Sequence, residues 1–231
     1  MPVAKPGTAL VVGASRGLGL ALSREWLSRG WSVIATVRGG SHTDLHKVAE
    51  QSAGRLAIEQ LEVTAPDAVN ALRKRLSGSQ IDLLFLNAGV SLGAGDRVDS
   101  ISTEEFNRIM VTNALSPMRI IEALGDLVRP EGTIAAMSSS LGSVSLNESG
   151  GWEVYRASKA ALNTLMRSYA VRHAGRNLAL VDPGWVRTDM GGPQANLSIE
   201  ESIPGVVDAL EALAGKPGLR YFNYRGETVP W

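Results

Sequence analysis

Residues 8–30, TALVVGASRGLGLALSREWLSRG, determine the fold class of this chain. The apolar run 8–12 predicts a short buried strand, and the amphipathic run 18–30 predicts a helix that ends at a glycine. The turn between them contains three more glycines, Gly13, Gly17 and Gly19. Glycine lets the backbone turn tightly and pass close to its neighbours, so this stretch is typical of the first strand–turn–helix unit of an open α/β sheet.

The rest of the chain repeats this alternation of short apolar runs and longer amphipathic ones. Further strands are expected at residues 31–37, 55–63, 81–89, 132–139, 177–184 and 219–231, the last one with a tail. Further helices are expected at residues 43–52, 66–76, 102–124, 152–174 and 198–213. The order predicts one Rossmann-type domain over residues 1–231, a doubly wound parallel sheet of about seven strands with helices on both faces. Residues 184–214 would contribute an inserted loop and the late helix.

The composition excludes several classes of function. The 231 residues carry 23 Lys and Arg against 23 Asp and Glu, so the chain has no net charge that would hold nucleic acid or an anionic membrane. There is no cysteine, which excludes thiolate chemistry, and the histidines His42, His46 and His173 lack the spacing of a metal site. No signal peptide and no membrane-spanning run is recognisable, so we expect a soluble cytoplasmic protein.

The glycine turn predicts a dinucleotide site, because backbone amides at a helix N-terminus bind a pyrophosphate. Such turns also occur for packing alone, but the position of this one in the first unit of the sheet favours binding. No carboxylate follows the second strand before Asp44, which disfavours NAD, whose free ribose hydroxyls are usually bound by an acid there. Arg38 follows that strand and Arg16 lies in the turn, so two guanidiniums could bind the 2′-phosphate of NADP. The alternative is that both are solvated surface arginines.

The stretch GWEVYRASKAALN, residues 151–163, places a phenol and an ammonium four residues apart, at Tyr155 and Lys159. On a helix these positions share a face, about 5–6 Å apart. A cation beside a phenol lowers its pKa from about 10, which would make the pair an acid–base group. The same spacing arises by accident on protein surfaces, so this interpretation depends on the rest of the chain.

Taken in order, the glycine turn, LNAG at residues 86–89 and the tyrosine–lysine pair resemble the short-chain dehydrogenase/reductase family. The resemblance covers essentially the whole chain, and residues 137–163 are similar to the C-factor and Sniffer-like carbonyl reductases within that family. It implies an NADP(H)-dependent oxidoreductase that reduces a small or medium aldehyde or ketone, with alcohol oxidation as the reverse reaction. It also implies a homodimer or homotetramer that pairs through helices near residues 103–123 and 152–174.

The resemblance assigns the chemistry to four side chains. Tyr155 would protonate the carbonyl oxygen, and Lys159 would lower the pKa of that phenol and hold the nicotinamide ribose. Ser139 would donate a hydrogen bond to the substrate oxygen, although either neighbouring serine remains an alternative. Asn113 would hold a water that relays protons to Lys159, but an asparagine on a helix is also commonly a packing residue.

The resemblance also implies which residues bind the cofactor and the substrate. The cofactor set is Gly13, Ser15, Arg16, Gly17, Leu18, Gly19, Arg38, Glu62, Val63, Asn87, Ala88, Gly89, Tyr155, Lys159, Pro183, Val186 and Thr188. The substrate wall, besides Ser139 and Tyr155, is Leu141, Val144, Trp152, Trp185 and Met190. Apolar loop residues often only pack against the core, and a threonine such as that at position 188 can simply cap a short helix.

Some positions depart from the family pattern, and two other functions remain open. Val12 stands where the family has threonine and Leu86 where it has a second asparagine, which would remove hydrogen bonds that brace the cofactor loop. Residues 143–151 lengthen the loop before Tyr155 and enlarge the border of the substrate site. One rival function is a cofactor-binding regulator without turnover. The other is a related enzyme that dehydrates or epimerises its substrate.

Overall fold

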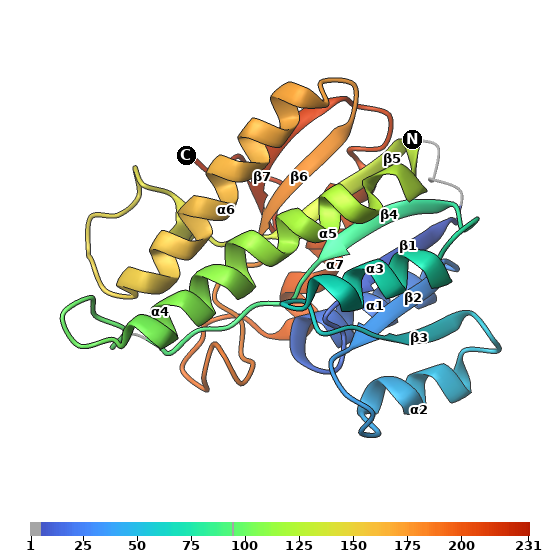
Figure 1. The fold of residues 1–231 in the computed structure, drawn as a ribbon, viewed down its shortest axis with the longest axis horizontal. Coiled ribbons are helices and arrows are strands. Elements are labelled where there is room, and N and C mark those ends of the chain that lie inside the picture. The colour runs from blue at the N-terminus through green and yellow to red at the C-terminus, as the bar shows by residue number, and fades with distance from the viewer. Residues whose placement is uncertain (1–5, 94) are drawn as a thin grey trace.

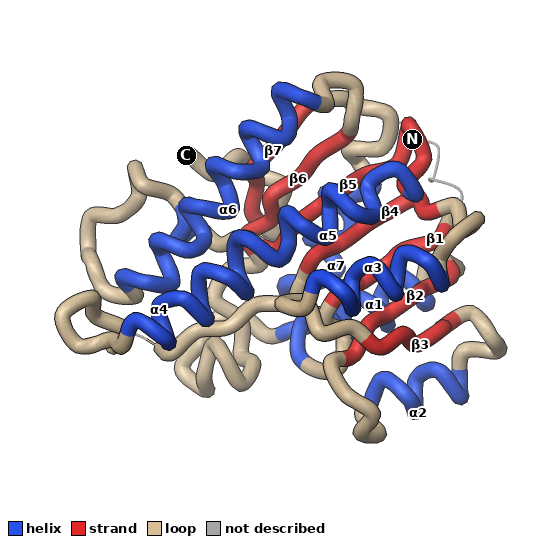
Figure 2. The backbone as a smooth tube through the Cα atoms, in the orientation of Figure 1, coloured by secondary structure: helices blue, strands red, loops and turns tan. Residues whose placement is uncertain are grey.

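The computed structural model describes residues 6–93 and 95–231. Seven parallel strands form one sheet in the order β3-β2-β1-β4-β5-β6-β7, with helices on both faces (Figures 1 and 2). The strands are β1 (Thr8–Val12), β2 (Ser32–Val37), β3 (Leu56–Gln60), β4 (Ile81–Leu86), β5 (Val128–Met137), β6 (Asn177–Asp182) and β7 (Gly218–Asn223). The predicted doubly wound parallel sheet is confirmed.

The helices cover the sheet in two layers (Figure 1). They are α1 (Gly17–Ser28), α2 (Asp44–Gln51), α3 (Pro66–Arg75), α4 (Thr103–Met110), α5 (Ser116–Leu124), α6 (Glu153–Arg172) and α7 (Ile199–Glu211). One apolar cluster packs α1 and α7 on one face of the sheet, and a second packs α3, α5 and α6 on the other. The central strands are continuous apolar runs because both of their faces are buried.

The helix expected at residues 102–124 is interrupted. Ser102 caps its start by accepting a hydrogen bond from Glu105 N at 3.1 Å, and α4 follows. A π-helical segment, Val111–Leu115, then separates α4 from α5. Asn113 lies in this wider turn and its side chain binds the backbone of a neighbouring loop at Val90. π-Helical turns are frequent at functional sites, and no periodicity in the sequence marks this one.

Strand β5 begins earlier than expected, at Val128 instead of residue 132. Its register with β4 shifts between Ile81 and Leu83, because the first pair, Ile81 with Val128, precedes an irregular stretch. A Cβ at Gly132 would lie 2.7 Å from the carbonyl oxygen of Asp82. The irregularity therefore depends on glycine at that position.

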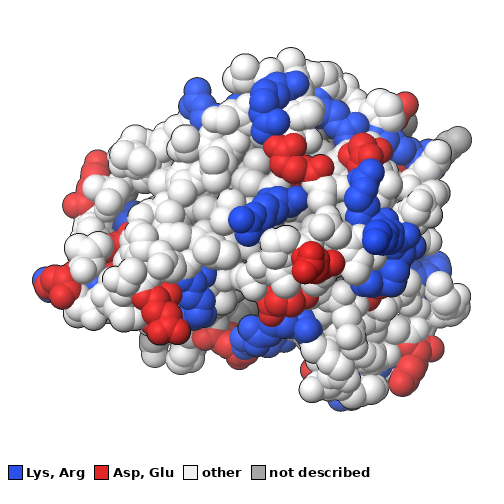
Figure 3. All heavy atoms as spheres, viewed as in Figure 1, with Lys and Arg blue, Asp and Glu red and all other residues white. Residues whose placement is uncertain are grey.

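The surface carries acidic and basic side chains side by side, as the face in Figure 3 shows. Arg29, which follows the last residue of α1, binds Asp208 and Glu211 of α7 at 2.6 and 3.0 Å, for example. Among the described residues, no helix combines the length and the apolar character needed to cross a membrane.

Candidate active site

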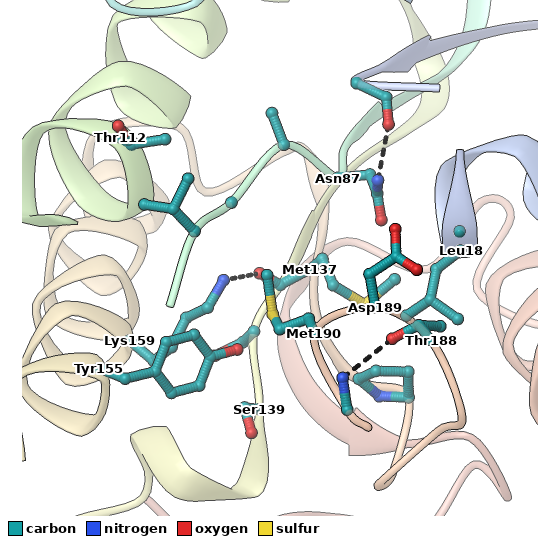
Figure 4. A pocket seen from close by; sticks show the side chains of 18 of the residues that line it. Leu18, Asn87, Thr112, Met137, Ser139, Tyr155, Lys159, Thr188, Asp189 and Met190 are labelled. Atoms are coloured by element: carbon teal, nitrogen blue, oxygen red, sulfur yellow. Dashed lines mark hydrogen bonds between the residues drawn. The ribbon is translucent and has the colours of Figure 1, made fainter. Parts of the chain in front are cut away.

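A cavity of about 750 Å³ opens at the carboxyl ends of the strands. Its walls come from the β1–α1 turn, the ends of β2, β4, β5 and β6, the start of α6 and the segment after β6 (Figure 4). Ligands of open α/β sheets bind at this edge. All the site residues predicted from the sequence line the cavity except Gly19, Asn113 and Val144.

The turn after β1 is shaped by close backbone packing. A Cβ at Gly19 would lie 2.1 Å from the carbonyl oxygen of Gly13, and Gly13 itself has φ of 88°, so neither position accepts another residue easily. Asn87 donates a hydrogen bond to Gly13 O at 2.7 Å (Figure 4), and Thr36 accepts one from Gly13 N at 3.0 Å. The hydroxyl of Thr36, on β2, thus braces the turn even though position 12 is valine.

The two predicted phosphate-binding arginines differ in their surroundings. Arg38 is exposed at the end of β2, lines the cavity, and has no ion-pair partner within residues 6–93 and 95–231. Arg16 also lines the cavity, but its guanidinium pairs with the Asp189 carboxylate across the mouth. Glu62, predicted beside the adenine, accepts from the amide and hydroxyl of Thr64 at 3.1 and 2.8 Å. Arg38 is therefore the arginine that is free to bind an anion.

Lys159 and Tyr155 lie together at the opposite end of the cavity (Figure 4). The Lys159 side chain is 3% exposed, donates to Met137 O at 2.8 Å, and has its Nζ 5.6 Å from the centroid of the Tyr155 ring. Burial lowers the pKa of Lys159 to about 8. The structure therefore places the Lys159 ammonium beside the Tyr155 ring, as the four-residue spacing predicts.

The pKa of Tyr155 is raised in this structure, whereas the sequence predicts that it is lowered. Burial raises the pKa of the phenol, the Asp182 carboxylate raises it further, and a hydrogen bond with Ser139 lowers it by less. Desolvation disfavours the phenolate more strongly than its neighbours stabilise it. The phenol is therefore protonated at neutral pH, which is the state a proton donor requires.

The three adjacent serines have different partners. Ser138 is buried and donates to Asn163 Oδ1 at 2.7 Å. Burial raises the pKa of the Asp182 carboxyl, and Ser140 opposes this rise. Ser139 Oγ accepts from Leu141 N at 3.2 Å, and Ser139 is the one of the three serines that lowers the pKa of Tyr155. The geometry thus distinguishes Ser139 from its neighbours.

Asn113 stands behind the cavity and ties two segments together. Its Oδ1 accepts from Val90 N at 2.8 Å, and its Nδ2 donates to Val90 O at 2.8 Å and to Ser158 Oγ at 3.0 Å. A Cβ at Gly89 would lie 3.4 Å from Asn113 Oδ1 and 3.6 Å from Lys159 Nζ, so the three residues are neighbours. The predicted role of Asn113 in holding a water stays a prediction.

The expected substrate wall needs one correction. Val144 is 73% exposed and does not line the cavity, because its backbone N donates to Trp231 O at 2.7 Å and the chain turns there towards the C-terminal tail. Trp185, 51% exposed, and Met190 do line it. Thr188 accepts from Gly191 N at 3.1 Å, so its hydroxyl stabilises a turn in the same segment.

Sequence reasoning missed several buried polar residues around the site. Asp182 ends β6 and lines the cavity, and Tyr221 of β7 donates to the carbonyl oxygen of Ser139. Asp96 accepts from the backbone N of Tyr155 at 2.9 Å. An acid that ends an apolar strand was a usable signal for Asp182. No sequence pattern marked Asp96 or Tyr221, since their partners lie far away in the chain.

Comparisons with known proteins identify the family of this chain. The short chain dehydrogenase family model matches residues 7–197. The C-signal protein of Myxococcus xanthus is 37% identical over 155 residues, 65% of this chain and 93% of its own length. The 1-hydroxy-2-glutathionyl-2-methyl-3-butene dehydrogenase of Rhodococcus sp. (strain AD45) is 31% identical over 97% of this chain and 99% of its own length.

Solved structures extend this likeness to the whole chain. A short-chain dehydrogenase/reductase from Burkholderia multivorans, solved with bound NADP, is 52% identical over 98% of this chain and 100% of its own, with a TM-score of 0.96. A carbonyl reductase from Pseudomonas aeruginosa PAO1 in complex with NADP is 38% identical over 98% of this chain and 100% of its own, with a TM-score of 0.91. With the match to the family model over most of its length, the chain belongs to the short-chain dehydrogenase/reductase family.

Proposed function

We propose that this oxidoreductase uses NADPH to reduce the carbonyl of a small or medium aldehyde or ketone, with alcohol oxidation as the reverse reaction. One observation carries the proposal. A single cavity has Tyr155, Lys159 and Ser139 at one end and a glycine turn with the unpaired Arg38 at the other. Two similar proteins were solved with NADP, which supports the choice of cofactor.

The residues at the cofactor end fit a dinucleotide phosphate. A Cβ at Gly17 would meet nothing within 4 Å, so the backbone at the start of α1 is open on that side. Backbone amides at a helix N-terminus bind phosphate oxygens, and Arg38 would bind the 2′-phosphate through charge-assisted hydrogen bonds. Bound NADPH would supply the hydride, and the protein supplies orientation and the proton.

The roles of the catalytic side chains follow from their protonation states. Tyr155, whose pKa is raised by burial, keeps its proton at neutral pH and donates it to the oxygen of the reduced carbonyl. Ser139 donates a second hydrogen bond to that oxygen, and two donors aimed at developing negative charge stabilise a transition state. Lys159 is held by Met137 O beside the Tyr155 ring, where its charge favours negative charge on the phenol oxygen after the proton leaves.

The substrate end of the cavity is apolar. Leu141, Trp152, Trp185 and Met190 line it. Trp152 and Tyr155 meet edge to face with centroids 6.0 Å apart. This wall favours an uncharged substrate with an apolar body, because binding there is driven mainly by the burial of apolar substrate surface away from water.

We also propose that the enzyme is a homodimer or homotetramer in the cytoplasm. The helices on one side of the sheet leave large apolar side chains exposed, namely Phe106, Leu115, Leu165 and Val171. Light scattering at several protein concentrations tests the oligomeric state.

The test of the proposed activity is NADPH consumption by the purified protein over a panel of aldehydes, ketones and quinones, with NADH in parallel. Turnover with NADPH on uncharged carbonyls is the expected result. NADPH binding without turnover on any carbonyl would contradict the proposal and favour the regulator. The site does not support the regulator, since a protein that only binds the cofactor needs no serine hydroxyl in the same cavity as a buried tyrosine and lysine.

A further inference from the structure

The first turn of α6 carries Tyr155 and begins without a cap of its own. Its N-cap residue is Trp152, whose side chain makes no capping hydrogen bond. Trp152 has φ of 53° and ψ of 36°, a left-handed conformation that is strained for a bulky side chain. The first amides of a helix have no carbonyl partner within the helix, so another part of the chain must bind them.

Asp96 supplies that acceptor from a loop far away in the sequence. Its Oδ2 accepts from Tyr155 N at 2.9 Å. The Asp96 side chain is only 3% exposed. A buried carboxylate is costly unless it is hydrogen-bonded, and the positive end of a helix dipole is a place where it is favourable.

The helix binds the loop in return. Glu153, the first residue of α6, accepts from Val98 N through Oε2 at 3.0 Å. Each segment therefore caps the other, as in a capping box, but between two distant parts of the chain. The same loop is fixed at its start, because Asn113 binds both the N–H and the carbonyl of Val90.

Arg156 holds the other side of the helix start. Its guanidinium donates to the carbonyl oxygens of Gly151 and Gly150 at 2.9 and 3.2 Å. Its backbone N donates to Trp152 O at 2.7 Å. Strained backbone persists only where its surroundings fix it. Here Arg156 binds the carbonyl oxygens of residues 150–152, and Asp96 binds the helix turn that follows Trp152.

We propose that Asp96 is a positioning residue of the active site: together with the reciprocal bond of Glu153, it fixes the first turn of α6 and thereby the direction of the Tyr155 side chain. The inference rests on the proposed role of Tyr155 as proton donor. Fraying of this turn would move the phenol relative to the carbonyl oxygen it serves. Lys159 lies one turn further and keeps its own bond to Met137, so its position does not depend on this cap.

The test compares Asp96→Ala and Asp96→Asn with a matched control in the same loop. The control is Asp99→Ala, because the Asp99 carboxylate binds only the side chain of Arg97 at the surface among the described residues. A misplaced catalytic group costs on the order of 10- to 100-fold in rate, so Asp96→Ala should lower kcat by that factor with the Kd for NADPH unchanged. Asp96→Asn keeps an acceptor oxygen and should recover most of kcat, and Asp99→Ala should match the wild type.

A second measurement tests the hydrogen bond from Asp96 to the start of α6 independently of enzyme activity. Hydrogen exchange at the Tyr155 amide should be at least about tenfold faster in Asp96→Ala and unchanged in Asp99→Ala, because exchange reports local opening. If Asp96→Ala does not fold, Asp96→Asn should show kcat and exchange close to those of the wild type.

The proposal is overturned if Asp96→Ala keeps kcat within twofold of the wild type, or if NADPH affinity falls as much as kcat. Unchanged exchange at the Tyr155 amide would also overturn it. If the wild type reduces no carbonyl, the proposed function fails, whereas the exchange comparison still decides whether Asp96 fixes the helix start.

Discussion

The two ends of the cavity are built from different parts of the chain. At the cofactor end the backbone sets the shape, because a Cβ at Gly19 would lie 2.1 Å from Gly13 O. At the catalytic end buried polar side chains set it, such as Lys159 on the Met137 carbonyl and Asn113 on the Val90 backbone. Substitutions at the cofactor end should therefore change the unfolding free energy and the cofactor affinity. Substitutions at the catalytic end should change the turnover rate and the pH dependence of stability.

The largest combined effect on stability and cofactor affinity is expected from Gly19→Ala. The new methyl group would overlap Gly13 O and the Asn87 side chain, so the turn must move. Overpacking of this kind costs about 3 kcal/mol of unfolding free energy, and the moved turn should bind NADPH at least about 100-fold more weakly. Denaturant unfolding and fluorescence titration with NADPH measure both effects.

Gly175→Ala is the matched control, because a Cβ there meets nothing within 4 Å. It should leave both quantities within error of the wild type. Normal NADPH affinity in Gly19→Ala would show that the close backbone packing at Gly19 does not determine cofactor binding.

Lys159→Met should abolish turnover and, at neutral pH, stabilise the fold. Burial lowers the pKa of Lys159 to about 8 in the native state, against an ordinary value of 10.5. Below pH 8 both native and unfolded chains are protonated and the native state bears the full cost of the buried charge, on the order of 3 kcal/mol. Unfolding free energies of both proteins, measured from pH 6 to pH 10, test this expectation.

The sign of the pH dependence is specific. Between pH 8 and pH 10.5 the unfolded wild type binds more protons at Lys159 than the native protein does, so wild-type stability rises with pH relative to the variant. The advantage of Lys159→Met should therefore shrink as pH rises through 8. An advantage that stays constant with pH would contradict the buried-charge account. Lys74→Met, on exposed surface of α3, controls for the substitution itself.

Arg38→Asp should shift cofactor preference from NADPH towards NADH by about 10- to 100-fold. The guanidinium is unpaired among the described residues and would lose charge-assisted hydrogen bonds of about 1.5–3 kcal/mol to the 2′-phosphate. The ratio of kcat/KM with the two cofactors measures the shift. Arg24→Asp, on the exposed side of α1, should leave the ratio unchanged. An unchanged ratio in Arg38→Asp would place the phosphate elsewhere.

Trp185→Ala should have the smallest effect. The side chain is half exposed at the cavity, so its loss removes about 1 kcal/mol of apolar contact and raises the substrate KM about fivefold. NADPH affinity and unfolding free energy should not change. Val144→Ala is the control, since Val144 points away from the cavity and its substitution should leave KM alone.

Local patterns in the sequence were enough to predict the sheet and the glycine turn, and the Tyr155–Lys159 pair gained its meaning from its order after them along the chain. Each depends on residues close in sequence, such as the run 8–30 or the four-residue spacing on a helix. The bracing of the turn by Thr36 was not predictable in the same way, because it requires knowing which strand lies beside β1.

The errors have the same origin. Val144 was assigned to the substrate wall as an apolar loop residue, but a hydrogen bond to Trp231 turns that segment away. The cap from Asp96 joins residues 59 positions apart. The direction of the Tyr155 pKa also depends on burial by the whole fold, whereas the sequence showed only the neighbouring lysine.

The central claim is that Tyr155 is the proton donor of a carbonyl reductase. The most direct test is the rate of NADPH consumption by the wild type and by Tyr155→Phe, with the same aldehyde or ketone and with NADPH binding measured in both. The account predicts turnover that falls by at least about 100-fold in the variant, since positioned acids contribute about 10²–10⁴-fold, and unchanged NADPH affinity. Near-normal turnover by Tyr155→Phe would contradict it.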